Sequence, residues 1–252
     1  MAGVSLETAI IVGLTFLLAG FVKGTIGLGL PTVTLAILTA TLGLKPAMAI
    51  LLVPSMVTNI WQGLVGGHLQ TILKRIWTML LGLCIATWLG SEVLANSSAE
   101  LLAGLLGVVL AGYAVLGLVR LEAPSPGRHE RWLTPVVGVA SGLLNGMTGS
   151  FVVPGVIYLQ ALGLSRDALV QAMGVLFTTS TIALGLALRG QGLLSPDLAM
   201  VSAGGAIPAV AGMILGQHVR RRLSEEAFRT IFFAGLAALG GYIAIRALAS
   251  IW

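Results

Sequence analysis

The chain has 252 residues, of which 57% are hydrophobic and only 9% are charged, and its mean hydropathy is +1.01. A soluble globular domain has roughly a quarter of its residues charged, whereas several apolar runs here reach the ~20 residues that a helix needs to cross a bilayer. The composition therefore excludes a soluble protein and predicts a polytopic all-α membrane protein, because backbone polar groups in lipid must be satisfied within helices. The net charge of +5 comes from basic residues between apolar runs, so the expected partner is a lipid bilayer and not nucleic acid.

Ten apolar segments follow in chain order, with one polar stretch between the fifth and the sixth. This stretch, residues 120–131 (RLEAPSPGRHER), predicts a cytoplasmic linker between a first transmembrane repeat at 1–119 and a second at 132–252. In each half the first two segments are short and only a glycine-rich motif separates them. Each such pair either crosses as tilted helices or forms a broken or re-entrant pair. The segments cover about 6–22, 26–43, 47–67, 72–92, 100–119, 133–147, 150–163, 167–188, 195–218 and 226–250.

The two glycine-rich motifs occupy matching positions in the two halves. The first is GFVKGTIGLGLP (20–31) and the second is GLLNGMTGSFVVP (142–154). Both read G-x3-G-x2-G followed within a few residues by proline, and the three glycines keep a constant offset of 122 residues. A motif that recurs once in each half predicts an internal duplication with a site where the halves meet.

The basic residues predict the topology. Ten Lys and Arg residues fall on one side of the predicted spans and three on the other, which places the larger set in the cytoplasm and both termini outside it. An odd number of crossings in each half would make the two repeats inverted. The larger set is Lys74, Arg75, Arg120, Arg128, Arg131, Arg166, Arg220, Arg221, Arg222 and Arg229, and the smaller set is Lys45, Arg189 and Arg246.

The glycine motifs carry the candidate binding site. A helix beginning near Thr25 would present free N–H groups and a positive dipole end beside Lys23, which suits a small oxyanion. Polar residues in the third helix of each half would form a second wall. The alternative is that the glycines only pack helices while Lys23 extends to a headgroup. The predicted substrate-binding residues are Lys23, Gly24, Thr25, Gly27, Gly29, Asn59, Asn145, Gly146, Thr148, Gly149, Ser150, Thr178 and Thr179.

Catalytic, metal and cofactor motifs are missing from the sequence. All nine acidic residues lie at segment ends or in loops, so no carboxylate is expected at mid-membrane, where proton- or sodium-coupled carriers commonly keep one. No His–Glu metal pair, serine elbow or phosphate-binding loop occurs, and Cys84 stands alone. We therefore expect no catalytic residue, metal ion or cofactor.

Residues 21–31 (FVKGTIGLGLP), the weaker second copy and the length of the chain resemble the TauE/SafE sulfite-exporter family. The resemblance implies a small protein of two homologous halves, with about eight spans, in a bacterial inner membrane. It implies transport of sulfite, a sulfonate or a related sulfur-containing or small organic anion, mostly outward. Two alternatives stay open, namely a membrane-embedded enzyme or accessory subunit, and a channel for a neutral solute. The oligomeric state is also open, with a homodimer as one option.

Overall fold

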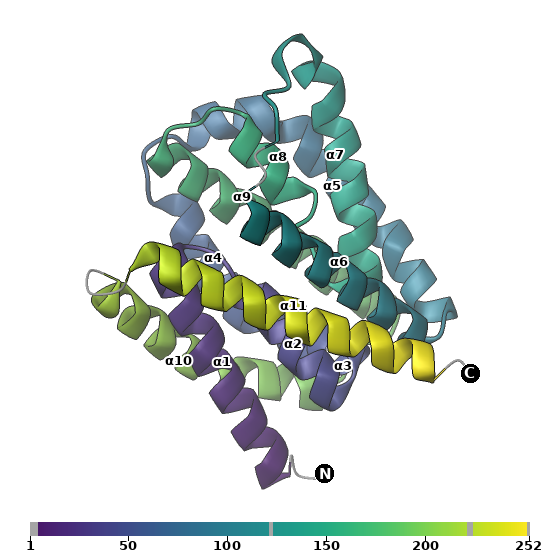
Figure 1. The fold of residues 1–252 in the computed structure, drawn as a ribbon. Helices are drawn as coiled ribbons and strands as arrows, with labels where there is room; N and C mark the ends of the chain where they lie inside the picture. Colours follow the sequence, from purple (N-terminus) through teal and green to yellow (C-terminus); the bar gives the residue numbers. More distant parts are fainter. Residues whose placement is uncertain (1–4, 121–122, 221–223, 251–252) are drawn as a thin grey trace. The chain divides into compact units, whose positions relative to one another are not determined.

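The computed structural model describes residues 5–120, 123–220 and 224–250, and within these ranges every regular element is a helix (Figure 1). The helices form two compact units, and each unit draws on both halves of the sequence. The predicted all-α class is confirmed, whereas the repeats at 1–119 and 132–252 stay a prediction. Two arginines counted for the topology, Arg221 and Arg222, lie outside the described residues, as do residues 121–122 of the linker.

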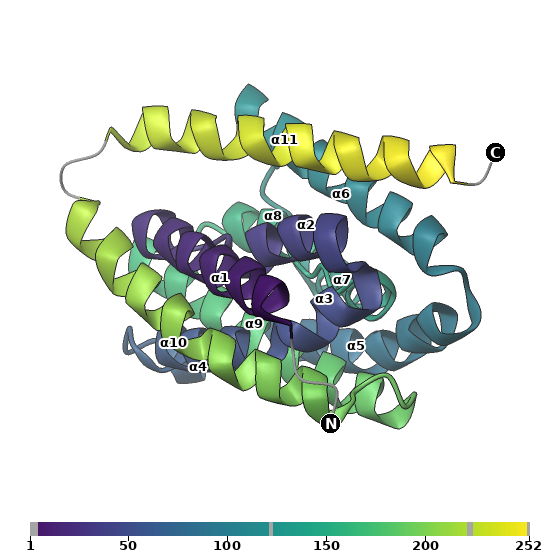
Figure 2. The ribbon, with the colours of Figure 1, turned by 90° about the horizontal axis from the view of Figure 1, so that it is seen from below.

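The first unit comprises Met1–Pro54, Ser98–Arg120 and Leu194–Trp252. Its helices are α1 (Leu6–Ile26), α2 (Leu30–Leu42), α3 (Leu44–Ile50), α6 (Ala99–Val119), α10 (Pro196–Val219) and α11 (Glu225–Ala249). Helix α1 packs along α10 and α6 packs along α11, and Figure 2 shows both pairs side by side. The short helix α2 packs on α1, α3 and α11, so it is the central element of this unit.

The second unit comprises Ser55–Ser97 and Leu121–Leu193. Its helices are α4 (Leu52–Leu64), whose first turn belongs to the first unit, α5 (Leu69–Asn96), the 3-10 turn η1 (Gly127–His129), α7 (Glu130–Thr148), α8 (Gly155–Ala161) and α9 (Arg166–Gly190). Helix α5 packs along α7, as Figure 1 shows, and also contacts α9. The short helix α8 contacts both α7 and α9.

Two of the three long helix pairs are parallel and are held together by glycines. In both pairs a Cβ added to the glycine would lie within 3.0 Å of a backbone carbonyl of the facing helix, so the backbones touch. Residue numbers rise together along both helices, which gives the direction. The facing residues are Gly20–Ala209 and Gly24–Met213 in the pair α1–α10, and Gly138–Met79 and Gly146–Thr87 in the pair α7–α5.

The third long pair, α6 with α11, is antiparallel. Gly104 near the start of α6 faces Ala247 near the end of α11, and Gly117 near the end of α6 faces the ring of Phe233. Between them Gly107 lies against the backbone of Ala244. The absence of a side chain at these glycines lets the two backbones approach closely.

Serine side chains start five of the helices. In each case the serine hydroxyl accepts a hydrogen bond from the backbone N–H three residues later, which satisfies one of the unpaired donors of the first turn. The hydroxyls and amides are those of Ser5 and Thr8, Ser98 and Leu101, Ser165 and Ala168, Ser195 and Leu198, and Ser224 and Ala227.

The outward faces of the helices are apolar while many hydroxyl and amide side chains are buried. On α1 the exposed residues Leu6, Ile10 and Leu14 follow one another at helical spacing. A stripe of this kind on a soluble protein would be a large exposed apolar patch, whereas against lipid tails it is the expected surface. The exposed stripe is therefore consistent with a membrane protein.

Six described helices are long and apolar enough to cross a membrane, or seven if the bent pair α3–α4 counts as one span. All ten expected apolar segments contain helices, with α3 and α4 both in the third, but not every one of these helices is long enough to cross. The first segment was expected to end at residue 22, but α1 continues through Gly24 to Ile26 and has 21 residues. The second segment yields only the 13 residues of α2, which are too few to span a bilayer.

The broken helix pair lies after the first glycine motif and not within it. Helices α3 and α4 meet at Leu51 with a bend of 44°. Pro54 has no N–H and is best tolerated in the first turn of a helix, which agrees with α4 beginning two residues before it. The side chain of Ser202 on α10 accepts a hydrogen bond of 3.0 Å from the Val53 N–H, which satisfies a backbone donor of this first turn.

Replacing Ser202 with alanine is expected to destabilise the protein by about 1–3 kcal/mol, because the part-buried Val53 N–H would lose its acceptor. For a chain of this size, 1 kcal/mol corresponds to a shift in Tm of roughly 2–4 °C. Thermal denaturation of the detergent-purified protein measures this shift. Thr230→Val is a suitable control, since the exposed Thr230 hydroxyl bonds only its own helix, to Glu226 O. Equal melting temperatures for the two variants would contradict the role assigned to Ser202.

Candidate functional site

The first glycine motif forms the end of α1, the loop after it and the start of α2. Lys23 lies in the last turn of α1 and is only 3% exposed. Gly27 ends the helix in the left-handed conformation (φ 81°), and its N–H donates to Lys23 O at 2.8 Å. Gly29, with φ 109°, begins α2, and both values favour glycine because a Cβ would clash with the backbone. The Thr25 hydroxyl donates to Phe21 O at 2.8 Å.

The second motif repeats this local structure at the end of α7. Gly149 ends α7 with φ 74°, and its N–H donates to Asn145 O at 2.8 Å. The Thr148 hydroxyl donates to Leu144 O at 2.7 Å and accepts from the Ser150 N–H at 3.2 Å. Lys23 and Asn145 thus occupy the same position, four residues before a left-handed glycine cap.

The expected helix N-terminus beside Lys23 is wrong. Thr25 does not begin a helix but lies in the last turn of α1, so Lys23 stands at the negative end of the α1 dipole. The physical reason lies in the first two glycines of each motif. Gly24 is packed against the backbone of Met213 in α10, so it stays helical where an unpacked glycine would favour a loop. Only the third glycine ends the helix.

Asn145 joins three helices of the second unit. It is fully buried, and its Nδ2 donates to Thr87 Oγ1 of α5 at 3.1 Å and to Ser180 O of α9 at 3.0 Å. The Thr87 hydroxyl already donates to Leu83 O, so it must accept from Asn145, and this fixes the orientation of the amide. The Asn145 Oδ1 then has no hydrogen-bond partner among the described residues.

Ser141 is a candidate site residue that the sequence analysis did not name. It precedes Asn145 by four residues and therefore lies on the same face of α7. Its side chain is fully buried, and within the described chain its hydroxyl has no hydrogen-bond partner. A Cβ added to Gly155 of α8 would lie 3.1 Å from Ser141 Oγ, so α8 closes over this serine. The helical spacing from Asn145 was the only signal in the sequence.

A family model described as sulfite exporter TauE/SafE matches residues 12–243, which is most of the chain. The chain belongs to the TauE/SafE family. The resemblance seen in the sequence is confirmed, and the protein is a multi-pass membrane transporter and not an enzyme, because the family is one of transporters. Comparison with curated proteins and with solved structures gave no match.

The polar residues predicted as a second wall lie in the second unit of this TauE/SafE protein. Asn59 of α4 is fully buried. Thr178 donates its hydroxyl hydrogen to Gly174 O of its own helix at 2.8 Å, which is how a threonine is satisfied inside an apolar helix. Thr179 is partly exposed and directly precedes Ser180, whose carbonyl accepts from Asn145. The structure therefore brings Asn145 to α9 next to Thr179.

The predicted residues divide between the two units. Lys23 and the other residues of the first motif belong to the first unit, whereas Asn145, Asn59 and the α9 threonines belong to the second. The first group includes the buried Lys23 and Thr25, and the second includes the buried Asn59 and Asn145. Their use of a common substrate stays a prediction.

The charged groups outside the spans form ordinary interfacial pairs. Glu130, the first residue of α7, accepts from Arg75 Nε at 2.6 Å and from Arg75 Nη2 at 2.9 Å. The hydrogen bond from Arg75 lowers the pKa of the Glu130 carboxyl. Arg120 pairs with Glu226 in the first unit. Among the described residues no three His, Cys, Asp or Glu side chains come together as metal ligands would.

Proposed function

We propose that this TauE/SafE protein exports a small anion such as sulfite, a sulfonate or a related sulfur-containing organic anion from the bacterial cytoplasm. The observation that carries the proposal is Lys23, a basic side chain that is only 3% exposed and lies in a helix able to span the membrane. A buried charge inside a membrane is costly, and such residues usually mark the path of an ion or a substrate. A positive charge at this place favours an anion.

The two glycine motifs supply the proposed binding residues. We infer that Lys23, Gly24, Thr25, Gly27 and Gly29 act in the first unit. In the second unit the proposed residues are Asn59, Asn145, Gly146, Thr148, Gly149, Ser150, Thr178 and Thr179, to which Ser141 is added. The equal backbone structure of the motifs, with Lys23 and Asn145 both four residues before a left-handed glycine, supports equivalent roles.

The hydrogen bonds of Asn145 limit which anions it could bind. Both of its N–H hydrogens are donated to protein groups, so the atom left for a ligand is the acceptor Oδ1. An acceptor repels a bare oxyanion but receives a hydrogen bond from a protonated one, such as hydrogensulfite. The Ser141 hydroxyl can donate to the oxygens of the same ion. This combination supports a substrate that carries both a negative charge and a hydrogen-bond donor.

The two halves are proposed to be inverted repeats. Helices α6 and α11 end the two halves, and they run in opposite directions within the first unit. A repeat related by an axis in the membrane plane reverses equivalent helices, whereas an axis along the membrane normal does not. The pair α1–α10 also corresponds to the pair α7–α5, because each joins the first helix of one half to the penultimate helix of the other. The antiparallel pair supports inversion, and the matching pairs support two equivalent halves.

The membrane potential can drive the proposed export without a coupling ion. An inside-negative potential favours the exit of an anion by about 2.3 kcal/mol per charge per 100 mV. All described acidic residues lie near helix ends or in loops, so an anion uniporter fits better than a carrier that needs a mid-membrane carboxylate. Both termini are then proposed to lie outside the cytoplasm, since the larger basic set is expected inside.

The test is thermal denaturation of the purified protein with sulfite, sulfonates, thiosulfate and short carboxylates, followed by flux measurements in liposomes. A ligand at 100 times its Kd adds about 2.7 kcal/mol of stability, so a selective rise in Tm is expected with one sulfur oxyanion and none with chloride. The same anion should show saturable flux. A channel for a neutral solute would instead give flux without anion selectivity, and that result would overturn the proposal.

A further inference from the structure

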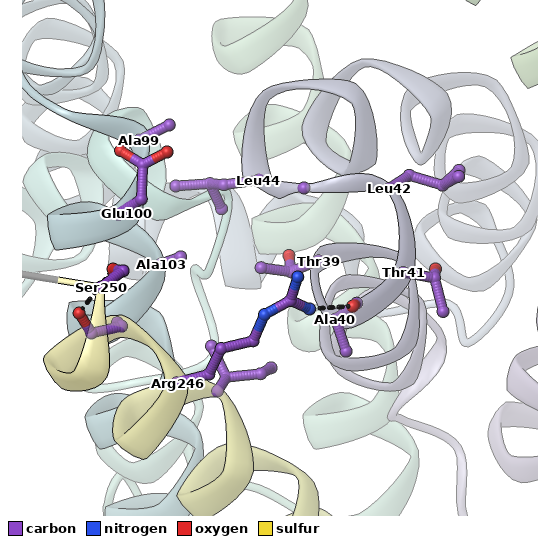
Figure 3. A pocket seen from close by; sticks show the side chains of 13 residues that line it. Thr39, Ala40, Thr41, Leu42, Leu44, Ala99, Glu100, Ala103, Arg246 and Ser250 are labelled. Atoms are coloured by element: carbon purple, nitrogen blue, oxygen red, sulfur yellow. Dashed lines mark hydrogen bonds between the residues drawn. The ribbon is translucent and has the colours of Figure 1, made fainter.

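A pocket separate from both glycine motifs lies in the first unit, at the ends of four helices (Figure 3). It has a volume of about 380 Å³ and is bounded by the end of α2, the start of α3, the start of α6 and the end of α11. This volume lies at the lower end of the range for small-molecule sites, so a ligand of modest size would fill it. Its polar lining includes Thr39, Thr41, Glu100, Arg246 and Ser250.

Arg246 is the basic group of this pocket. Its side chain extends from the last turn of α11 to the end of α2, where Nη1 donates to Ala40 O at 2.8 Å (Figure 3). This bond holds the guanidinium in place and uses one of its five N–H donors. The arginine is thereby oriented at the pocket wall and keeps donors for an oxyanion.

Glu100 is the acidic group of the same pocket and lies in the first turn of α6. Within the part of the chain that the structure describes, it forms no ion pair with Arg246. The carbonyl groups at the end of α2 add to the negative potential inside the pocket. The pocket therefore offers one place for a cation and one for an anion, and its formal charge is zero.

A third polar group is buried at the pocket. Thr39 is 7% exposed, and its Oγ1 has no hydrogen-bond partner among the described residues. It directly precedes Ala40, whose carbonyl accepts the hydrogen bond from Arg246, and both Thr39 and Arg246 line the pocket (Figure 3). A buried hydroxyl without a partner loses free energy that a ligand oxygen could restore, so the threonine supports a site for an oxyanion next to Arg246.

We propose that this pocket binds a zwitterion that carries an oxyanion and a primary ammonium. The oxyanion would contact Arg246 and Thr39, and the ammonium would contact Glu100 and the carbonyl groups ending α2. A simple anion is disfavoured by Glu100, and a simple cation by Arg246. A quaternary ammonium usually needs an aromatic cage, and the lining residues include no Phe, Tyr or Trp. The lining thus favours ethanolamine-type over choline-type groups.

The position of the pocket suggests two sources for this ligand. Arg246 lies in the last turn of α11 and Glu100 in the first turn of α6, and both helices are long and apolar enough to cross the membrane. The pocket is therefore at the depth of the lipid headgroups, where phosphatidylethanolamine presents this chemistry. A water-soluble aminoalkyl phosphate presents the same groups. The inference does not depend on the proposed function, because no residue of the glycine motifs lines the pocket.

The test measures the Tm of the full-length protein with soluble phosphoethanolamine, phosphocholine or phosphate. In parallel, the protein is placed in lipid nanodiscs containing phosphatidylethanolamine, phosphatidylcholine or phosphatidylglycerol. Native mass spectrometry then measures how much of each lipid stays bound to the protein. Stabilisation by phosphoethanolamine would identify a soluble zwitterion, and selective retention of phosphatidylethanolamine alone would identify the lipid. Equal binding of the ethanolamine and choline compounds, or binding of neither, would overturn the proposal.

Two variants test the contributions of Arg246 and Glu100 to binding separately. Arg246→Gln is expected to weaken ethanolamine-compound binding at least about 10-fold, the loss of roughly one charged hydrogen bond. Glu100→Gln should also weaken it, and should raise the relative binding of phosphate or phosphatidylglycerol, because the repelling carboxylate is gone. Arg189→Gln is the matched control, since this exposed arginine ends α9 and does not line the pocket. Binding by Glu100→Gln with the selectivity of the unaltered protein would overturn the proposal even if Arg246→Gln fails to fold.

Discussion

Replacing Lys23 with methionine is expected to reduce anion transport about 100-fold or more while the protein stays folded. Methionine has a similar length but no charge, so it removes the ammonium and keeps most of the packing. Loss of one partner from a buried charged contact costs roughly 2–5 kcal/mol, and 1.4 kcal/mol is a tenfold change. The initial rate of sulfite flux in liposomes measures the effect, once the substrate panel has identified the transported anion.

The stability of this variant separates a transport role from a structural one. Lys23 is 3% exposed, so methionine removes the cost of burying its charge but also removes any contact of its ammonium within the protein. We expect the variant to stay folded well above the temperature of the flux assay, which thermal denaturation measures, and to lose flux all the same. Lys74→Met, at an exposed lysine of α5, is the control and should transport normally. Flux of the Lys23→Met protein within twofold of the unaltered one would remove Lys23 from the anion path.

Much of the helical architecture could be predicted from the sequence, because its signals are local. Apolar runs of helical length and the polar linker located most of the helices within a few residues. Gly27 and Gly149 adopt left-handed conformations, which glycine reaches at little cost, at the breaks that the glycine motifs indicated. Each of these features depends on residues that are neighbours in the chain.

The role of the first two glycines of each motif could not be predicted, since it depends on a distant helix. G-x3-G is the pattern of a helix packed closely on another, and it is also compatible with a loop. The choice is made by α10, whose backbone lies against Gly20 and Gly24. In the sequence Met213 is nearly 190 residues away from Gly24, and nothing local identifies it as the partner. Lys23 was consequently expected beside a helix start and lies at a helix end.

The pocket at Arg246 escaped prediction for a similar reason. Arg246, Glu100 and Thr39 come from three separate segments, and only the packing of α2, α6 and α11 brings them together. The sequence indicated Arg246 as a topology signal and Glu100 as an ordinary helix-end acid. Residues that meet only after the chain has folded leave no regular spacing in the sequence. The glycine motifs do have such a spacing, so they could be recognised.

Alanine substitutions of the glycines along α1 are expected to distinguish two roles. Some glycines let two helices touch, and others adopt a backbone conformation that alanine disfavours. A Cβ at Gly24 would lie within 3.0 Å of the backbone of Met213, so α1 and α10 would have to move apart. Overpacking of this kind usually costs 1–3 kcal/mol and occasionally more, and here the obstacle is backbone that cannot change rotamer. Gly24→Ala should therefore show the largest fall in Tm, and Gly146→Ala should match it, since its Cβ would meet the Thr87 backbone in the same way.

The other glycines of the helix act as internal controls. Gly27 has open space around a Cβ but a φ of 81°, so Gly27→Ala should lose only about 1–2 kcal/mol from the left-handed conformation. Gly13 lies mid-helix with no described atom within 4 Å of a Cβ, so Gly13→Ala should be neutral or gain up to about 1 kcal/mol. Thermal denaturation should thus rank the variants in the order Gly24, Gly27, Gly13, from least to most stable. If the melting temperature of Gly24→Ala equals that of Gly13→Ala, then α1 and α10 are not in backbone contact at Gly24.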